Sequence, residues 1–369
     1  MKKFLKNLWV NISMAFEIFK SFLLMCLVVI AIFLALGAVV HNVFKIREIY
    51  SEDNLGYKNL VNVSGNRMNV YVKGEGERTI VILSNFANPS PILQYKTYTD
   101  RLVANNYRVV VIEYFGYGYS LSTKDSRNIG YLAKEINEAL TAAEVFGPYT
   151  ILANGTSGLY GLVYARNYPE LVDELVLVDS IYPATINEED VKAKIADDNF
   201  NLRITSFAEL TGYARVLSYI KPDMFGIDKM KELGYSKAEI SCYRKMIANR
   251  FYTKTMRNEY KELANNMEII KDCKFPEYLN TIQIISSEYE EGKLLKKNVK
   301  NYAEDLITNS SIQKVYIVNG EKDNLSLSNP DEVTNLIINN QINNQMTNNE
   351  IVNNEMINVE QVNTDINNY

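Results

Sequence analysis

Residues 149–179 read YTILANGTSGLYGLVYARNYPELVDELVLVD, and this stretch decides the fold. Tyr149–Ala153 and Leu175–Val178 are short apolar runs of the kind that form strands buried on both faces of a sheet. The segment between them, up to about residue 167, is predicted to be a helix. A strand, a helix and a second strand in this order predict parallel strand pairing, with the helix packed on one face of the sheet.

The same alternation continues on both sides of this unit. Further buried strands are predicted at Thr79–Leu83, Tyr107–Ile112, Ile282–Ile285 and Val315–Val318, and helices at 92–105 and 129–146. Before them, Tyr57–Val63 and Met68–Val72 flank Ser64-Gly65-Asn66, which predicts a hairpin. The whole pattern indicates a mostly parallel sheet with helices on both faces.

Two segments depart from this pattern. Between 181 and 275 the buried strands stop and charged, helix-favouring stretches take over, which predicts a helical cap inserted into a domain over 57–338. In 339–369 the units NNQI, NNQM, NNEI and NNEM recur. Such an Asn-rich, low-complexity segment is typical of a mobile tail, with a polar-faced helix or an added strand as the alternatives.

An uncharged apolar segment near the N-terminus predicts a transmembrane helix. Residues 22–40 (FLLMCLVVIAIFLALGAVV) would extend roughly 28 Å as a helix, which is close to the thickness of the hydrocarbon core of a bilayer. A buried core helix would show a polar stripe, and this segment has none. A cleaved signal peptide ending near Ala35-Leu36-Gly37 is the other alternative, but the polar segment 1–21 is long and partly amphipathic, so we expect an uncleaved signal-anchor.

The flanking charges predict the orientation of the chain in the cell membrane. Four lysines, Lys2, Lys3, Lys6 and Lys20, precede the span, whereas Lys45 and Arg47 follow it. Positive charge favours the cytoplasmic side. We therefore expect a single-pass protein with a cytoplasmic N-terminus and an extracytoplasmic main domain.

The composition excludes several functions. A net charge of -5 and a pI near 5.3 argue against a nucleic-acid partner. The three cysteines cannot form a disulfide framework, although the pairing of Cys242 with Cys273 stays open. No set of zinc or iron ligands can be assembled, so we expect no metal and no cofactor. The single histidine, His41, adjoins the apolar segment and is badly placed for catalysis.

Several motifs resemble those of the α/β-hydrolases. Glu113–Ser120 (EYFGYGYS), directly after a buried strand, resembles the D-x-x-G-x-G-x-S loop of that family. Tyr149–Pro169 resembles its strand, nucleophile elbow and helix, and Asn329–Val333 the start of its final helix. The resemblance covers 57–338. It implies the α/β-hydrolase fold, with a mostly parallel central sheet, flanking helices and a helical cap.

The elbow resembles the family in sequence position but not in chemistry. The family pattern is G-x-S-x-G, with the nucleophilic serine on a strained turn between strand and helix. Tyr168-Pro169 fixes the register and places Ala153–Ser157 on these five positions. The nucleophile position is then Gly155, which has no side chain. Ser157 lies two residues later and is interpreted as a small packing residue, or as a fallback nucleophile.

The other catalytic positions implied by the resemblance also differ. The position of the family's histidine corresponds to Asp323, or to Lys322 if the alignment is fixed on Gly320. The acid position is best matched by Glu288, which as an exposed loop carboxylate needs no function. A carboxylate with a pKa near 4 is a weak general base for a serine hydroxyl.

The backbone around the elbow retains one expected function. The resemblance implies that the N–H groups of Phe86 and Thr156 form an oxyanion-type pocket, since backbone groups survive a change of side chain. Tyr114 and Tyr117 are candidates to line this pocket, or they are ordinary packing residues.

The sequence as a whole favours a membrane-anchored α/β-hydrolase-fold protein without catalytic activity. It would bind a small acyl or carboxylate ligand or a protein partner. The alternative is a divergent esterase- or peptidase-like hydrolase that uses Ser157 or a rearranged site of Asp323, Lys322 and Glu288. A third hypothesis is a tether whose Asn-rich tail does the binding.

Overall fold

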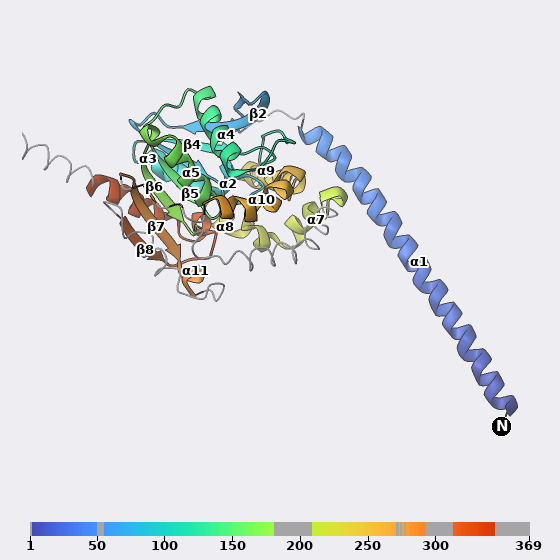
Figure 1. The fold of residues 1–369 in the computed structure, drawn as a ribbon. Helices are drawn as coiled ribbons and strands as arrows, with labels where there is room; N and C mark the ends of the chain where they lie inside the picture. The colour runs from blue at the N-terminus through green and yellow to red at the C-terminus, as the bar shows by residue number, and fades with distance from the viewer. Residues whose placement is uncertain are drawn as a thin grey trace, which may run out of the picture.

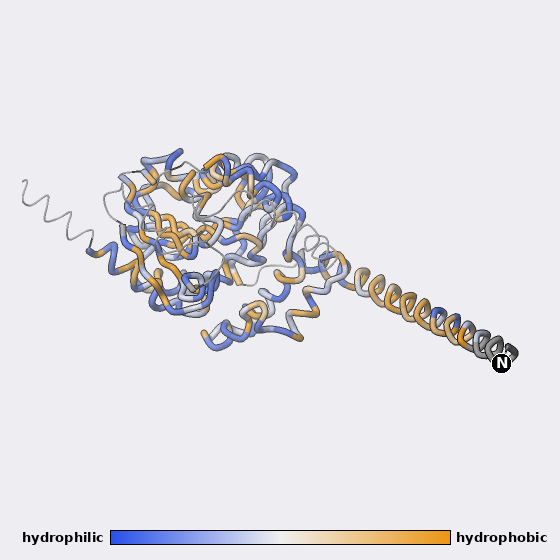
Figure 2. Tube along the Cα trace, turned by 60° about the horizontal axis from the view of Figure 1, so that its bottom comes forward, coloured by the Kyte–Doolittle hydropathy of each residue, from blue (hydrophilic) through white to orange (hydrophobic). Residues whose placement is uncertain are grey.

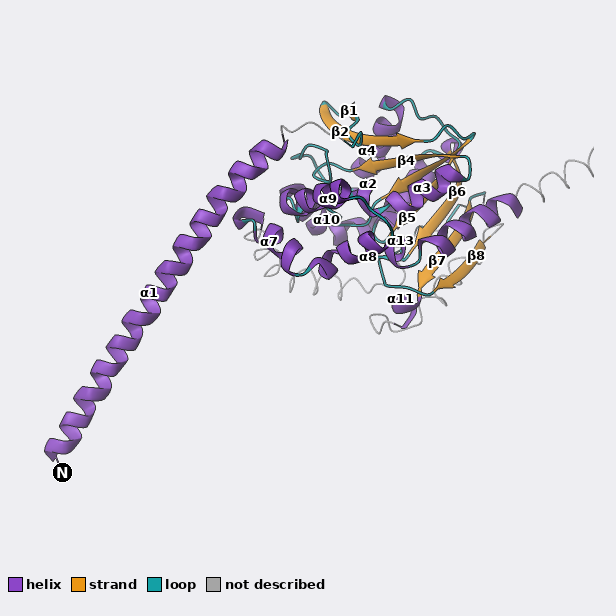
Figure 3. Ribbon diagram, turned by 180° about the vertical axis from the view of Figure 1, so that it is seen from behind, coloured by secondary structure: helices purple, strands orange, loops and turns teal. Residues whose placement is uncertain are grey.

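The computed structural model consists of a long N-terminal helix and an α/β domain (Figure 1). The structure describes residues 2–49, 55–180, 209–270, 273, 275–276, 278–291 and 313–343. The helix projects away from the domain, and its C-terminal end lies beside it (Figures 1 and 3).

Helix α1 runs without interruption over Lys2–Ile49, so the segments expected at 1–21 and 22–40 form one helix. Its portion Ile12–Glu48 is long and apolar enough to cross a membrane, and none of its most apolar window is buried. Figure 2 shows this helix as a mainly hydrophobic rod outside the domain. By length and composition α1 is suited to be a membrane anchor or a signal sequence.

The sheet has the order β1-β2-β4-β3-β5-β6-β7-β8 in the described part of the chain. The strands are β1 (Leu60–Val63), β2 (Asn66–Lys73), β3 (Arg78–Leu83), β4 (Tyr107–Glu113), β5 (Tyr149–Asn154), β6 (Val172–Val178), β7 (Asn280–Ser286) and β8 (Gln313–Val318). From β4 to β8 every neighbouring pair is parallel, whereas β2 pairs antiparallel with both β1 and β4. All the strands predicted from the apolar runs are therefore confirmed.

The predicted hairpin closes through a two-residue turn. Val63 pairs with Asn66, and the residues between them, Ser64 and Gly65, have φ angles of 47° and 76°. Two successive positive φ angles are typical of a type I′ turn, whose twist matches that of the flanking strands.

Helices cover both faces of the sheet. They are α2 (Pro91–Gln94), α3 (Lys96–Ala104), α4 (Ile129–Ala142), α5 (Ser157–Asn167), α11 (Ser287–Glu291) and α13 (Leu325–Ser328). Side chains of α4 and α5 belong to one hydrophobic cluster and those of α2 and α3 to the other, so the sheet separates two cores. The single helix expected over 92–105 is interrupted at Tyr95 and forms α2 and α3.

Further helices precede β7 and form the described part of the expected cap. They are α7 (Tyr213–Ile220), α8 (Ile227–Glu232), α9 (Lys237–Arg250) and α10 (Lys254–Ile270), with the 3₁₀ turn η3 (Pro222–Phe225). Figure 3 shows them between α1 and the sheet. The first part of the segment expected to be the cap, 181–208, lies outside the described residues.

The final helix is longer than the sequence indicated. It covers 330–343, so the first five residues of the expected tail, 339–343, are helical. Asn340 and Gln341 are buried there and donate hydrogen bonds of 2.8 Å and 2.6 Å to the carboxylate of Glu174 on β6. These bonds give the two amides a structural role at the N-terminal end of β6. Residues 344–369 lie outside the described residues.

Candidate functional site

The turn between β5 and α5 has the backbone geometry of a nucleophile elbow. Gly155 lies between the last residue of β5 and the first turn of α5, with a φ of +55°. Its N–H donates to the carbonyl oxygen of Val178 on β6 at 2.8 Å. A Cβ on Gly158 would lie 2.6 Å from the Cβ of Ser180, so helix and strand approach closely here. The structure therefore places Gly155 at the strained turn.

The space that a side chain at position 155 would need is filled by Asn85, which follows β3. A Cβ built on Gly155 would overlap Oδ1 and Cγ of Asn85 and would lie 2.7 Å from its Nδ2. The strands β3 and β5 are neighbours in the sheet, which brings residues 85 and 155 together. A side chain at 155 could form only if the Asn85 carboxamide moved.

The two N–H groups of the expected oxyanion pocket point to one oxygen of the protein itself. The N–H groups of Phe86 and Thr156 donate to Asn85 Oδ1 at 2.8 Å and 3.0 Å. The hydroxyl of Thr156 also donates to this oxygen, at 3.2 Å. Donors at 2.7–3.1 Å are the geometry with which such pockets bind an oxyanion. The structure thus brings the amides of Phe86 and Thr156 to one place, where they bind the side chain of Asn85, which sequence reasoning did not single out.

The candidate histidine position lies next to this group. Although Asp323 is exposed overall, burial of its carboxylate raises the pKa of Asp323 above its usual value. Lys322 opposes this shift, Asp179 reinforces it, and a hydrogen bond from Asn85 opposes it in turn. Asp323 thus adjoins the elbow through Asn85. The Nζ of Lys322 lies 4.4 Å from the centre of the Tyr289 ring and so takes another direction.

Two carboxylates hold the loops around Asp323. Asp179, at the end of β6, accepts from the N–H of Ser286 at 2.6 Å and from that of Asp323 at 2.9 Å. Glu288 is exposed and accepts from the N–H of Lys322 at 2.8 Å. In the structure both acids are thus engaged with backbone groups.

The hydroxyl of Ser157 is buried beneath the strand ends. Ser157 has no exposed surface. Its Oγ accepts from the N–H of Asn154 at 2.8 Å and lies 2.9 Å from the carbonyl oxygens of Leu83 and Asn154, to which it can donate. These contacts join β3 to β5 and leave the hydroxyl no solvent contact.

The two candidate tyrosines fill the space between the core and the cap. Tyr114 and Tyr117 are buried, with ring centres 5.4 Å apart in an edge-to-face arrangement. The hydroxyls of Tyr117 and Tyr160 donate to the carboxylate of Glu259 on α10 at 3.1 Å and 2.7 Å. Burial raises the pKa of Glu259, while Arg127 and the two hydroxyls oppose the shift. Sequence reasoning missed Glu259, although its spacing from Met256 and Leu263 places it on the apolar stripe of α10.

The loop that resembles D-x-x-G-x-G-x-S is organised around Glu113. This buried carboxylate accepts from the N–H of Tyr119 at 2.7 Å and from Nδ2 of Asn69 at 3.1 Å. Burial raises the pKa of Glu113 to about 7, against the effect of these two hydrogen bonds. Gly118, with φ of +44°, packs directly on the carboxylate, and a Cβ there would overlap it. The loop is therefore held by a buried acid.

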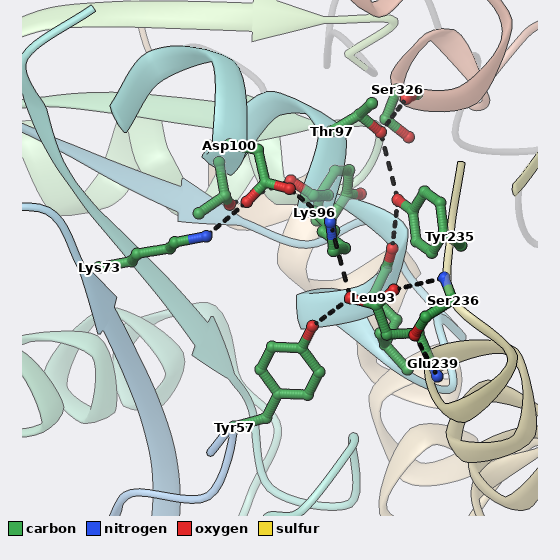
Figure 4. Close-up of polar contacts among 12 residues, drawn as sticks. Tyr57, Lys73, Leu93, Lys96, Thr97, Asp100, Tyr235, Ser236, Glu239 and Ser326 are labelled. Carbon is green, nitrogen blue, oxygen red and sulfur yellow. Dashed lines mark hydrogen bonds and ion pairs between the residues drawn. The ribbon is translucent and has the colours of Figure 1, made fainter. Parts of the chain in front are cut away.

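A polar seam holds the cap on the core (Figure 4). Glu239 at the start of α9 accepts from the hydroxyl of Tyr57 at 2.8 Å and lies 3.6 Å from the ammonium of Lys96. Tyr235 donates to the carbonyl oxygen of Leu93 at 2.9 Å. These contacts join α9 and Tyr235, just before it, to α2, α3 and the segment before β1.

The remaining predictions on site chemistry concern metals and thiols. Among the described residues no group of three or more potential ligands could hold a metal ion. No disulfide joins Cys242 to Cys273. The hydroxyl of Tyr119 lies 3.2 Å from Sγ of Cys242.

No model of a protein family matches the chain. The uncharacterized protein YbdG of Bacillus subtilis is 23% identical over 253 residues, which are 67% of this chain and 74% of that protein.

Solved structures share its architecture. The epoxide hydrolase VrEH1 from Vigna radiata has a TM-score of 0.60 and 18% identity, and the match covers 76% of this chain and 96% of that one. An esterase from Exiguobacterium antarcticum has a TM-score of 0.53 and 15% identity, covering 76% and 98%. At these identities the likeness concerns the fold and not the activity. The chain adopts the α/β-hydrolase fold, with a long apolar helix before it.

Proposed function

We propose that this protein is a membrane-anchored α/β-hydrolase-fold module that binds a ligand or partner and does not hydrolyse a substrate. The observation that carries the proposal is the Asn85 carboxamide, whose oxygen accepts from the N–H groups of both Phe86 and Thr156. In a hydrolase of this fold, the oxygen of the reacting carbonyl would occupy that place. Here a side chain of the protein does.

Two further features support inactivity. Gly155 offers no nucleophile, and a side chain there would overlap Asn85. The chain has one histidine, His41, which lies in α1 and packs against Gly212 of the cap. General-base assistance is typically worth about 10²–10⁴ in rate, and nucleophilic catalysis needs an activated nucleophile in addition. Both roles would have to be filled by other groups.

The alternative of a divergent hydrolase has less support. Ser157 would have to break its bonds to the backbone of Asn154 and Leu83 before it could attack a substrate. A rearranged site of Asp323, Lys322 and Glu288 lacks a nucleophilic hydroxyl or thiol of its own. Glu288 and Lys322 are moreover bonded to each other through the backbone.

A small acyl or carboxylate ligand remains part of the proposal, with one condition. Such a ligand could reach the N–H groups of Phe86 and Thr156 only by displacing the Asn85 carboxamide. Binding would then exchange the hydrogen bonds to Asn85 for hydrogen bonds to the ligand, so the net gain in binding free energy would be small. A protein partner that binds on the surface would not need to displace the Asn85 carboxamide.

The anchorage is proposed to be a single pass through the cell membrane by α1. The four lysines before residue 22 outnumber the two cations that directly follow the apolar segment, Lys45 and Arg47, which favours a cytoplasmic N-terminus. The cap and the candidate site would then lie outside the cytoplasm.

A serine-reactive fluorophosphonate probe tests the proposal. We expect the full-length protein in detergent to remain unlabelled, and p-nitrophenyl acetate hydrolysis to equal that of the heat-denatured control. Labelling of the wild-type protein that disappears in Ser157→Ala would overturn it. A thermal-shift screen of short carboxylates tests whether the ligand is a small carboxylate. A larger stabilisation of Asn85→Ala than of the wild-type protein supports binding at the two amides. If neither protein is stabilised, the small carboxylate ligand is excluded and the proposed function requires a protein partner.

A further inference from the structure

The C-terminal turns of α1 are fixed to the cap by partly buried polar contacts. The guanidinium of Arg215 on α7 donates to both carboxylate oxygens of Glu48, at 2.8 Å each. Asn249 of α9 donates to the same carboxylate at 2.8 Å. Lys45 lies 3.5 Å from Glu209, just before α7. A bidentate arginine contact fixes direction as well as distance, so α7 is held in a defined position beside α1.

Contact with the cap begins inside the apolar part of α1. A Cβ on Gly37 would lie 3.6 Å from the carbonyl oxygen of Thr211, and His41 is buried against Gly212. The contact between α1 and the cap thus runs from residue 37 to residue 48, and over this length a helix rises roughly 17 Å. The polar zone on each side of a bilayer is roughly 5–7 Å thick. If residues 22–40 cross the membrane, the edge of the cap that bears α7 must therefore lie at headgroup level.

One face of α7 is strongly apolar and exposed. The large apolar side chains of α7 and its flanks that are more than half exposed are Leu210 (61%), Tyr213 (55%), Val216 (51%), Tyr219 (65%), Ile220 (69%) and Met224 (60%). Ala214 and Ser218, on the opposite side of the helix, are buried. Apolar surface of this extent marks an interaction site, and tyrosines are suited to a boundary between lipid and water. Figures 1 and 3 show α7 at the side of the domain that is nearest α1.

A cationic pocket adjoins this face. It has a volume of about 280 Å³ and is lined by Phe44, Glu48, Arg215, Tyr219, Ser241, Arg244 and Lys245. The lining thus has three cations and one carboxylate, and that carboxylate is already bound to Arg215. Arg244 lies over the ring of Tyr219 at 4.5 Å. The excess positive charge, next to apolar and aromatic side chains, matches an anionic lipid headgroup.

We propose that α7 is a membrane-surface helix, with its apolar face at the boundary between headgroups and acyl chains and the adjoining pocket around the phosphate of an anionic lipid. The inference rests on the proposed anchorage by α1. The apolar face belongs to the helix that Arg215 joins to α1, close to the level where α1 would leave the bilayer. The pocket supplies positive charge, which matches an anionic headgroup better than a zwitterionic one. The helix would orient the cap, and with it the candidate site, relative to the membrane.

Site-directed fluorescence quenching in nanodiscs tests the position of α7. The full-length chain with Cys26, Cys242 and Cys273 replaced by alanine would carry bimane at Val216→Cys, or at Phe146→Cys as the matched exposed control. We expect a lipid with a nitroxide on its headgroup to quench the Val216 probe at least twice as strongly as the Phe146 probe. Equal quenching would overturn the proposal. Shielding of the Val216 probe that depends on protein concentration without lipid would also overturn it, because the face would then contact a second copy.

A third probe separates this inference from the anchorage itself. Bimane at Phe33→Cys lies within the predicted span, and a nitroxide on the acyl chain should quench it. If it is quenched and the Val216 probe is not, α7 does not lie on the membrane although α1 crosses it. If neither probe is quenched, α1 does not cross the membrane, and the proposed anchorage itself is wrong. If circular dichroism shows that the cysteine-free chain does not fold, amide exchange of the wild-type chain replaces the probes. Exchange over 213–220 that is slower in nanodiscs than in lipid-free amphipol supports the proposal, and equal exchange overturns it.

The pocket is tested by lipid charge. We expect spin-labelled phosphatidylglycerol to be enriched over phosphatidylcholine near Val216. Removing two cations with Arg244→Gln and Lys245→Gln should reduce the preference fivefold or more, since each cation near an anionic surface contributes roughly a fivefold effect. The control pair Lys124→Gln and Lys134→Gln removes the same charge elsewhere and should leave the preference unchanged. Equal effects of the two pairs would contradict a specific pocket.

Discussion

The contact between Gly155 and Asn85 predicts a large and specific cost for restoring a serine at the elbow. In Gly155→Ser, the new Cβ would overlap Oδ1 and Cγ of the carboxamide, and the residue would keep a φ of +55°. The left-handed backbone alone costs a residue with a side chain about 1–2 kcal/mol. Overpacking typically adds about 1–3 kcal/mol, and the carboxamide would also lose hydrogen bonds. We expect a loss of about 3–5 kcal/mol of stability.

A double-mutant cycle isolates the steric part of this cost. Asn85→Ala removes all three atoms that the new Cβ would meet, so in this background Gly155→Ser should cost only the backbone term of about 1–2 kcal/mol. The coupling energy should thus be about 2–3 kcal/mol, with the double variant more stable than the sum of the single effects predicts. Gly234→Ser is a matched control, because Gly234 also has a positive φ, of +82°, but no atom lies within 4 Å of its Cβ position.

Urea denaturation of the full-length protein in detergent, followed by circular dichroism, measures these free energies. Tryptophan fluorescence would not report on the domain, because the only tryptophan, Trp9, lies in α1. The reasoning is refuted if Gly155→Ser costs no more than Gly234→Ser. It is equally refuted if the cost is the same with and without the Asn85 side chain.

Three further predictions concern stability. Ser157→Ala should destabilise the domain by about 1–3 kcal/mol, because a buried N–H loses its acceptor, and no probe labelling should change. Glu113 has a pKa of about 7 in the folded state against about 4.5 in the unfolded state. The stability that this difference contributes is therefore fully present below pH 4.5 and is lost as the pH rises through 7. The loss should amount to about 3 kcal/mol, and pH-dependent denaturation of Glu113→Gln should show a correspondingly flatter profile. Deleting 339–369 should lower the melting temperature below that of a chain lacking only 344–369, because Glu174 then stays buried without its two amide donors. Equal melting temperatures of the two truncated chains would contradict this role.

The fold was largely predictable because its signals are local. Each buried strand is a short apolar run between helices, and this alternation by itself favours a parallel sheet. The turn at Ser64-Gly65 and the apolar helix over 22–40 are equally local signals. The count of one histidine needs no structure at all.

The candidate site was predictable only as far as its backbone. The pattern around Gly155 indicated the elbow, and the N–H groups of Phe86 and Thr156 meet there at Asn85 Oδ1. That the Asn85 carboxamide lies between them depends on the sheet order, in which β3 and β5 are neighbours although about seventy residues separate the two turns. Side-chain direction across such a distance has no signature in a linear pattern.

What the sequence by itself determined about this protein is therefore its elements, their order and the residue types available for chemistry. Only the tertiary structure decided which groups meet: Asn85 with the elbow, Glu259 with the tyrosines, Glu174 with the last helix, and Glu48 with Arg215 of the cap. The physical reason is that periodicity and propensity act within one element. Burial and hydrogen bonding of polar side chains are settled instead by which elements pack against each other.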